Sequence, residues 1–340
     1  MITTRRNIFH NKVLLFGSIF CVLVLIIVSF SVLVVHELNL AKDSKWSYHE
    51  QDKWPGSCKT GKSQSPIPLC DRSSYPYQSD ALVFQNGSVE NFQITNNGHT
   101  VVMDFENPKP QLSGGGLTCK FTLRNLHFHW PSEHVINGKR YPLESHLIFI
   151  SEKFSTLKDA IAVPFAVTVL ATLYEESYNI THNHFQIINK AIEEVSVAPG
   201  KPFATFKSLN VFDFLPEDSE TFFQYTGSLT TPNCTENINW IVFRHTSSIT
   251  SEELGTLTNI HSKRNERVEF NNRLLQNINQ RTISLRNTLT SNDNINVISN
   301  PIFCQGFGQM ILRHVNVTRI SFLQNSNFVF FWFAPVNYSA

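Results

Sequence analysis

Residues 126–130 read Leu-His-Phe-His-Trp, and this stretch decides both the expected fold and the expected site. On a β-strand, residues two apart point to the same face, so His127 and His129 project together while Phe128 points to the other face. The segment Glu144-Ser145-His146 repeats this period and adds a carboxylate and a third imidazole on one face. Three histidines leave the fourth tetrahedral position of a zinc ion free for water, as in catalytic zinc sites. On spacing alone, the alternative is a solvated strand face that carries histidines without binding metal.

The sequence around this stretch, from Trp46 to about Arg286, consists of short apolar segments broken by Gly, Pro, Asn and Ser. Segments rich in Val, Ile, Phe and Thr are strand candidates. They are 81–84, 100–105, 117–130, 145–150, 165–174 and 239–243. Helix candidates are fewer, at 185–195 and at 251–260, the second of which follows Thr250 as an N-cap. This balance predicts a large β-dominated domain with peripheral helices.

Composition narrows the class of protein. The chain has 340 residues, a formal net charge of +1, 41% hydrophobic residues and 16% charged residues. That length permits one large domain or two small ones, each with a buried core. Nucleic-acid binding requires clustered Lys and Arg, which a near-neutral chain does not supply, so we exclude that class of partner.

The N-terminus contains an uncharged apolar run at residues 13–35 that is long enough to cross a bilayer as a helix. Basic residues without any acidic residue precede it, which predicts that residues 1–12 form a cytoplasmic stub. We therefore expect a signal anchor, or transmembrane helix, at 13–35, a linker at 36–45, and an extracellular or lumenal domain at 46–286. The alternative is a cleaved signal peptide, which would make the protein secreted.

The cysteines and the glycosylation motifs fit an oxidising compartment. Cys21 lies in the apolar run, and the five cysteines that follow it are Cys58, Cys70, Cys119, Cys234 and Cys304. Disulfides persist outside the cytoplasm, and an odd number leaves at least one cysteine over. Asn-x-Ser/Thr motifs, which predict a glycoprotein, start at Asn86, Asn179, Asn233, Asn316 and Asn337. Residues 287–340 have few charges and many Asn, and they remain an unassigned C-terminal tail.

Taken together, these segments resemble the α-class carbonic anhydrases over residues 46–286. The matching segments occur in family order. They are Trp46-Ser47-Tyr48, Gln64-Ser65-Pro66-Ile67, Asn97-Gly98-His99, the strand with His127 and His129, Ser132-Glu133-His134, Glu144-Ser145-His146, Tyr225 to Pro232, Trp240-Ile241-Val242, and Asn271-Asn272-Arg273 through Arg281. The resemblance implies a mainly β (α+β) fold with a large, mostly antiparallel central sheet and peripheral helices.

The resemblance also implies a function, the zinc-dependent reversible hydration of carbon dioxide to bicarbonate and a proton. His127, His129 and His146 match the three zinc ligands, and the attacking group is a zinc-bound hydroxide. Thr230 matches the hydroxyl that accepts the proton of this hydroxide, and Glu133 matches the acceptor of the threonine proton.

Further residues match supporting roles in the family. His99 matches the proton shuttle, a task that suits the ordinary pKa of imidazole. Tyr48 and Asn97 match polar positions along the water chain between zinc and shuttle. Glu144 matches the carboxylate that orients His146. Asn125 stands where the family usually has Gln bonded to His127, and its shorter side chain predicts that this bond is lost or bridged by water, with a modest loss of zinc affinity or activity.

The expected substrate pocket and disulfide follow from the same resemblance. The residues that match the substrate-binding wall are Thr231, Leu229, Val167, Ile148, Ile238 and Trp240. Cys58 and Cys234 match the disulfide of secreted and membrane-bound members. Cys70 and Cys119 either form a second bridge or remain free thiols, with Cys304 as the odd cysteine.

A different class of function is the alternative, namely a carbonic anhydrase-like binding or adhesion module that is weakly active or inactive. Members of that kind typically lack one or more of the zinc histidines, whereas all three are present here. The expected partners of an enzyme are the small molecules carbon dioxide and bicarbonate, the zinc ion, and a membrane contacted through the N-terminal helix.

Overall fold

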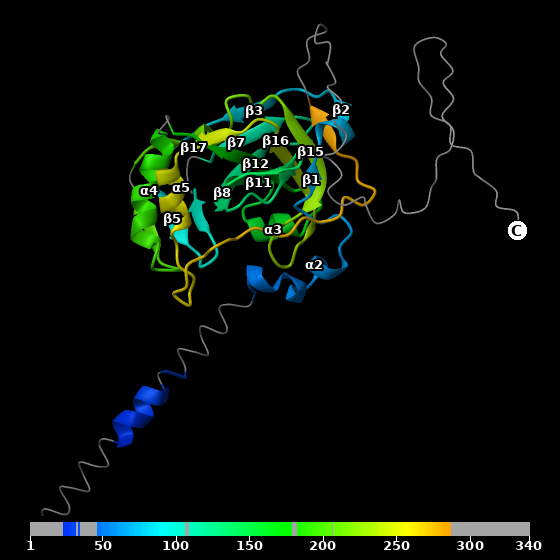
Figure 1. Ribbon diagram of the computed structural model, residues 1–340. Helices are drawn as coiled ribbons and strands as arrows, with labels where there is room; N and C mark the ends of the chain where they lie inside the picture. The colour runs from blue at the N-terminus through cyan, green and yellow to red at the C-terminus, as the bar shows by residue number, and fades with distance from the viewer. Residues whose placement is uncertain are drawn as a thin grey trace, which may run out of the picture. The chain divides into compact units, whose positions relative to one another are not determined.

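The computed structural model describes residues 23–31, 33–34, 46–105, 109–178, 182–205 and 207–286 (Figure 1). Residues 23–31 and 33–34, which are the described part of the predicted span 13–35, are helical. Within the described ranges, no helix is both long and apolar enough to cross a membrane. The predicted stub 1–12, the linker 36–45, the tail 287–340, and the motifs at Asn179, Asn316 and Asn337 lie outside the described residues.

A 13-stranded sheet forms the centre of the domain. Along its main path the strands are β13 (Pro202–Thr205), β5 (Phe92–Asn96), β6 (Val101–Asp104), β8 (Phe121–His129), β11 (Leu143–Ser151), β12 (Val167–Glu176), β16 (Glu236–Phe243), β15 (Phe222–Ser228), β18 (Ser284–Arg286) and β2 (Tyr75–Tyr77). Off this path lie β3 (Leu82–Gln85), β7 (Gln111–Gly114) and β17 (Ser247–Ile249). Only the pairs β12–β16, β12–β17 and β18–β2 are parallel within this sheet. The predicted mostly antiparallel sheet is therefore confirmed.

Short helices and two small sheets surround the central sheet. The helices are α2 (Ser57–Thr60), α3 (Leu157–Ile161), α4 (Asn183–Val195) and α5 (Ser251–Thr258), and the 3-10 helices are η1 (Tyr48–Lys53), η2 (Asp71–Ser73) and η3 (Val211–Phe214). The small sheets pair β1 (Pro68–Leu69), β9 (Val135–Ile136) and β10 (Lys139–Arg140), and β14 (Leu209–Asn210) with β4 (Ser88–Val89). Both predicted helices exist, and α5 begins with the expected Thr250 cap, which Glu253 completes as a capping box.

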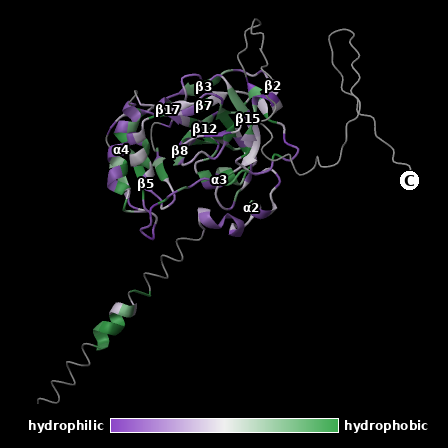
Figure 2. Ribbon diagram, in the orientation of Figure 1, coloured by the Kyte–Doolittle hydropathy of each residue, from purple (hydrophilic) through white to green (hydrophobic). Residues whose placement is uncertain are grey.

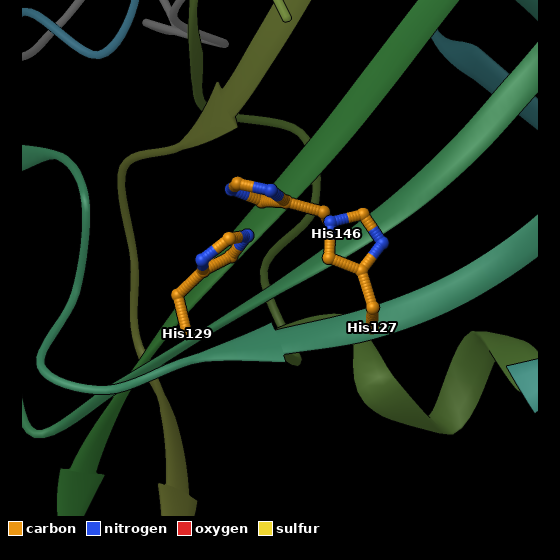
Figure 3. Close-up of side chains that lie close together, drawn as sticks. All are labelled: His127, His129 and His146. Carbon is orange, nitrogen blue, oxygen red and sulfur yellow. The ribbon is translucent and has the colours of Figure 1, made fainter. Parts of the chain in front are cut away.

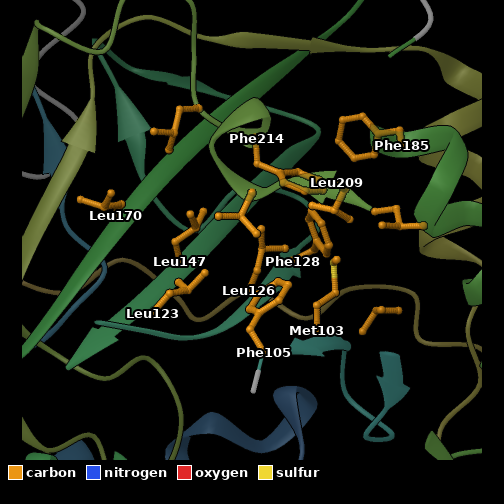
Figure 4. Close-up of a cluster of buried hydrophobic side chains, with 14 of the residues drawn as sticks. Met103, Phe105, Leu123, Leu126, Phe128, Leu147, Leu170, Phe185, Leu209 and Phe214 are labelled. Carbon is orange, nitrogen blue, oxygen red and sulfur yellow. The ribbon is translucent and has the colours of Figure 1, made fainter. Parts of the chain in front are cut away.

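The larger hydrophobic core lies on the sheet face opposite the histidines. Leu126 and Phe128 of β8 are fully buried there, next to Leu147 of β11 and Phe185 of α4 (Figure 4). Helix α4 buries its apolar residues in this core and carries hydrophilic residues elsewhere (Figure 2). Because side chains alternate along β8, burying this apolar face turns the histidine-bearing face toward the site.

The predicted disulfide between Cys58 and Cys234 is present and joins positions 176 residues apart. Cys119 is a free thiol, so a Cys70–Cys119 bridge is excluded. Cys70 is itself disulfide-bonded, and Cys304 lies outside the described residues.

Candidate metal centre

The antiparallel pairing of β8 with β11 brings the three predicted zinc ligands together. Register places His146 directly opposite His127, and the three imidazoles converge from the two strands (Figure 3). Each histidine offers one ring nitrogen, and these nitrogens lie within 4.8 Å of one another. Two neighbouring strands therefore supply the whole donor set.

The ring nitrogen of each histidine that points away from this cluster is held by a hydrogen bond. His129 donates from Nδ1 to the backbone carbonyl of Asn271 at 2.8 Å, and His146 donates from Nε2 to Glu144 Oε1 at 2.7 Å. A bond of this kind fixes the tautomer and leaves the lone pair on the other nitrogen. His129 Nε2 is buried and has no hydrogen-bond partner among the residues that the structure describes. A buried polar atom without a partner is unfavourable, so this nitrogen fits a metal ligand.

His127 is held by Asn125, which corrects one expectation from the sequence. Its Nδ1 lies 3.1 Å from Asn125 Oδ1, so the hydrogen bond is direct and is neither lost nor bridged by water. Both residues lie on β8 two positions apart, so their side chains project from the same face of the strand and the asparagine amide reaches the ring.

The electrostatics of the cluster favour neutral imidazoles beside an ionised carboxylate. Burial lowers the pKa of His127 and of His129, so both rings keep a free lone pair at neutral pH. Burial acts to raise the pKa of Glu144, but the adjacent His134 and His146 outweigh it and hold that pKa well below its usual range. Neutral imidazole is the form that binds zinc.

His134 is a supporting residue whose role sequence reasoning missed. It is fully buried, and its Nδ1 donates to the same Glu144 oxygen at 2.6 Å, while the Tyr225 hydroxyl lies 2.8 Å from its Nε2. The backbone N–H of His134 donates to the other oxygen of Glu144 at 2.7 Å. The sequence placed His134 in a matching segment, but only the fold brings Tyr225 to it.

Thr230 and Glu133 are both buried at the site, but the implied bond between them is not formed. Glu133 Oε1 accepts the backbone N–H of Arg273 at 2.8 Å. Glu133 Oε2 is buried without a hydrogen-bond partner in the part of the chain that the structure describes. One carboxylate oxygen therefore remains as an acceptor with no donor.

His99 lies at the mouth of the site on the loop before β6. Its ring stacks on Trp46, with centroids 4.0 Å apart and planes 8° apart. Burial, with a smaller contribution from the charge of Lys263, lowers the pKa of His99 to about 4. In this position the imidazole is neutral at physiological pH, contrary to the expectation of an ordinary imidazole pKa.

The two polar residues predicted along the water chain lie beside His99. Tyr48 is buried, and burial followed by the charge of Glu133 raises the pKa of its hydroxyl well above the usual value, so it stays protonated. Asn97 Oδ1 accepts the backbone N–H groups of His99 and Thr100 at 2.9 Å each. Asn97 therefore braces the loop as well as facing the site.

A cavity of about 240 Å³ contains the histidine cluster. Its lining includes the predicted residues Tyr48, Asn97, His99, Asn125, His127, His129, His146, Ile148, Leu229, Thr230, Thr231 and Trp240, together with Trp46, Thr100, Val102, Leu157 and Val169. Val167 and Ile238, the other two residues expected in the substrate-binding wall, are not among the lining residues of this cavity and are buried in the adjoining core.

The register of β12 explains why Val169 takes the place predicted for Val167. Val169 lies opposite Ile148, a lining residue, whereas Val167 lies opposite Ile150, two residues further along the sheet. Strand periodicity puts both valines on one face but does not say which one reaches the cavity.

This arrangement offers three imidazole nitrogen donors in a cavity that both apolar and polar side chains line. It suits a divalent cation such as zinc with one coordination position left for a water molecule. A small apolar molecule against Ile148, Val169 and Trp240 would lie beside that position.

Comparison with known proteins agrees with this geometry. The family model of eukaryotic-type carbonic anhydrases matches residues 42–287. The chain is 29% identical over 270 residues to putative carbonic anhydrase 5 of Caenorhabditis elegans, a match that covers 75% of this chain and 86% of that protein. It is 30% identical over 266 residues to carbonic anhydrase 6 of Mus musculus, covering 73% and 80% of the two chains. It is 30% identical over 226 residues to a carbonic anhydrase of Pectobacterium carotovorum, covering 66% and 81%.

The residues that the family model matches make up more than half of the chain, and they include the three clustered histidines. The resemblance found in the sequence is thus confirmed. The chain belongs to the family of eukaryotic-type carbonic anhydrases.

Proposed function

We propose that the chain catalyses the reversible hydration of carbon dioxide to bicarbonate and a proton, with a zinc ion held by His127, His129 and His146. The observation that carries this proposal is the donor set, in which three imidazoles converge and each outer nitrogen donates to an acceptor. Zinc bound there would act as a Lewis acid that lets a bound water molecule lose a proton near neutral pH.

The apolar side of the cavity binds carbon dioxide. Ile148, Val169, Leu229 and Trp240 line it, and together they exclude water from the reacting carbon. Carbon dioxide is small and uncharged, so it is held by the shape of the apolar pocket and by the exclusion of water rather than by charged groups.

Thr230 and Glu133 orient the attacking oxygen. For this the Thr230 hydroxyl turns to donate to Glu133 Oε2, a bond that is not formed in the structure, where this buried oxygen accepts no hydrogen bond from any described residue. With its own proton committed, the Thr230 oxygen can only accept, so it favours an attacking group that donates a hydrogen bond and directs a lone pair of that group toward carbon dioxide.

His99 carries the released proton to solvent. Stacked on Trp46 it has a pKa of about 4 and does not take up a proton at pH 7. The imidazole therefore leaves the Trp46 ring during the cycle, which restores a pKa near the ordinary value and a position within reach of buffer. Tyr48 and Asn97 line the route between His99 and the metal position.

The domain works outside the cytoplasm. The Cys58–Cys234 disulfide supports an oxidising compartment, and the apolar segment 13–35 supplies the export signal. Determining the mass of the mature protein tests whether this segment is retained. A chain that starts at Met1 is anchored, whereas one that starts near Lys42 is secreted.

N-glycosylation of Asn86 accompanies export. Asn86 is exposed on the turn between β3 and β4, at a φ of 57°. Asn233 is also exposed, but the next residue is the buried, disulfide-bonded Cys234, which we expect to prevent modification. Enzymatic removal of N-glycans should lower the mass of the tryptic peptide that contains Asn86 and leave that of Asn233 unchanged.

A carbon dioxide hydration assay tests the activity directly. Zinc-loaded protein should be active, should lose activity on treatment with a strong chelator, and should regain it when zinc is added back. The His146→Ala variant should be inactive throughout. An inactive wild-type protein that is folded and contains zinc would instead support the binding or adhesion module.

A further inference from the structure

Asn271 is a buried residue whose side chain is completely used in hydrogen bonds. Its Nδ2 donates to the backbone carbonyls of His99 and Phe128, at 3.0 Å each, and its Oδ1 accepts the backbone N–H of Trp130 at 2.6 Å. An amide has two N–H donors, so both are committed. Asn271 is fully inaccessible to solvent.

One of these bonds completes the fixation of the His99 backbone. The N–H of His99 donates to Asn97 Oδ1 at 2.9 Å, and its carbonyl accepts from Asn271. Both backbone polar groups of His99 therefore have partners from different parts of the chain. The backbone is held in place while the imidazole alone remains free to change position.

The other two bonds connect the same amide to the strand that carries the metal ligands. Phe128 precedes His129 on β8 and Trp130 directly follows the strand, so Asn271 bonds to the backbone on both sides of that ligand. The backbone of Asn271 adds a further link, since its carbonyl accepts from His129 Nδ1. A single residue thus contacts the ligand strand and the His99 loop together.

We propose that the Asn271 side chain is a positioning residue that sets the distance between the His99 loop and the metal-binding strand, so that proton transfer through His99 depends on it. This inference rests on the proposed function, because it requires His99 to carry the proton. It makes no use of Asn271 as a group that touches substrate.

The variant Asn271→Asp removes both N–H donors and keeps an acceptor for Trp130. The matched control is Asn272→Asp, the same change one residue along. The Asn272 side chain is half-buried and makes no hydrogen bond within the described ranges, and its backbone carbonyl accepts from Gln51 Nε2 at 3.1 Å. Asn271→Ala serves as a second variant without the added charge, and His99→Ala serves as the reference for loss of the shuttle.

Two measurements distinguish the loss of His99 positioning from a general loss of structure in the variant. Amide hydrogen exchange of the peptide that covers residues 96–100 should speed up about tenfold or more in Asn271→Asp and stay unchanged in Asn272→Asp. Turnover should fall roughly tenfold or more at saturating carbon dioxide, and kcat/KM should stay within about threefold, because only the proton-release step is impaired. Imidazole buffer should restore kcat in Asn271→Asp and in His99→Ala.

The results that would overturn the inference are distinct from those that would overturn the proposed function. If His99→Ala is rescued by imidazole and Asn271→Asp is not, the positioning role is wrong while the shuttle stands. If neither is rescued although the wild type is active, His99 is not the shuttle and the inference fails with it. Failure of both Asn271 variants to fold would also overturn the inference, because an amide that only places a loop is not needed for the domain to form.

Discussion

The chain contains two His-x-His pairs with the same spacing and nearly the same ring separation, and among the described residues only one of them belongs to a cluster of three imidazoles that could hold a metal ion. The rings of His127 and His129 on β8 lie 5.1 Å apart, and those of His182 and His184 at the start of α4 lie 5.3 Å apart. The β8 pair gains a third imidazole from β11. Among the described residues, no third ligand joins the pair at α4.

The surroundings of the two pairs explain the difference. Each β8 histidine donates its outer N–H to a fixed acceptor, which directs the other nitrogen toward the metal position. His184 instead packs its ring against Phe185 and Phe214, and its Nε2 is buried without a hydrogen-bond partner in the described part of the chain. The spacing of two histidines is therefore insufficient, since a metal site also needs a neighbouring strand in register and an acceptor behind each ring.

The largest expected effect comes from removing one histidine of each pair. His129→Ala should abolish stoichiometric zinc binding and carbon dioxide hydration, because two imidazoles cannot complete the site. His184→Ala should lower the melting temperature through lost packing but keep one zinc per chain and full activity. Zinc content after dialysis, measured by mass spectrometry, decides between them, and loss of zinc in His184→Ala would contradict the comparison.

The next effect concerns stability in acid. Burial, followed by the nearby His182, lowers the pKa of His184 to about 3. In the unfolded chain His184 takes up a proton near pH 6.5, whereas in the folded protein it stays neutral until about pH 3. The folded state is therefore fully stable with respect to this group above pH 6.5, and its unfolding free energy decreases as the pH falls toward 3. This amounts to about 3 kcal/mol at pH 4.

The variant His184→Phe measures this contribution because phenylalanine cannot take up a proton. Between pH 7 and pH 4, metal-free wild type should lose about 3 kcal/mol more unfolding free energy than metal-free His184→Phe, as measured by urea denaturation. Equal losses in the two proteins would show that His184 does not titrate in this way.

A smaller effect tests the acceptors behind the rings. Glu144→Gln should weaken zinc binding about 10- to 100-fold, because the orienting carboxylate of His146 is lost. Its counterpart beside the second pair is Glu253, whose Oε2 lies 3.9 Å from His182 Nδ1. Glu253→Gln should leave zinc affinity unchanged in a competition assay with a chromogenic chelator, and equal weakening in both variants would argue against the role of Glu144.

The smallest effect is expected at Asn125. Since Asn125 already bonds His127, Asn125→Gln should change zinc affinity by less than about threefold, whereas Asn125→Ala should weaken it about tenfold. Zinc dissociation rates in the presence of excess chelator provide the measurement. A large gain in Asn125→Gln would restore the original expectation that asparagine cannot reach His127.

Local sequence patterns predicted what depends on neighbouring residues. The period of two in residues 126–130 and 144–146 was enough to place three histidines on one sheet face, and the Thr250 cap was enough to start α5. These features rest on local strand and helix geometry.

What the sequence could not predict depends on register and on distant parts of the chain. Val169 rather than Val167 reaches the cavity because of its pairing with Ile148 across β11 and β12. The acceptor for His129 is a backbone carbonyl 142 residues away, at a position that any residue type could occupy. The lowered pKa of His99 follows from its burial where its ring stacks on Trp46, a contact that no local pattern signals.

X-ray absorption spectroscopy at the zinc edge of the zinc-loaded protein tests the central claim most directly. The account predicts four ligands at about 2.0–2.1 Å, of which three are imidazole nitrogens and one is a light atom from water. The three-imidazole signature should be absent from a zinc-soaked His129→Ala sample and remain unchanged in His184→Ala. A sulfur ligand, fewer than three imidazoles in the wild type, or a spectrum that responds to His184 would contradict it.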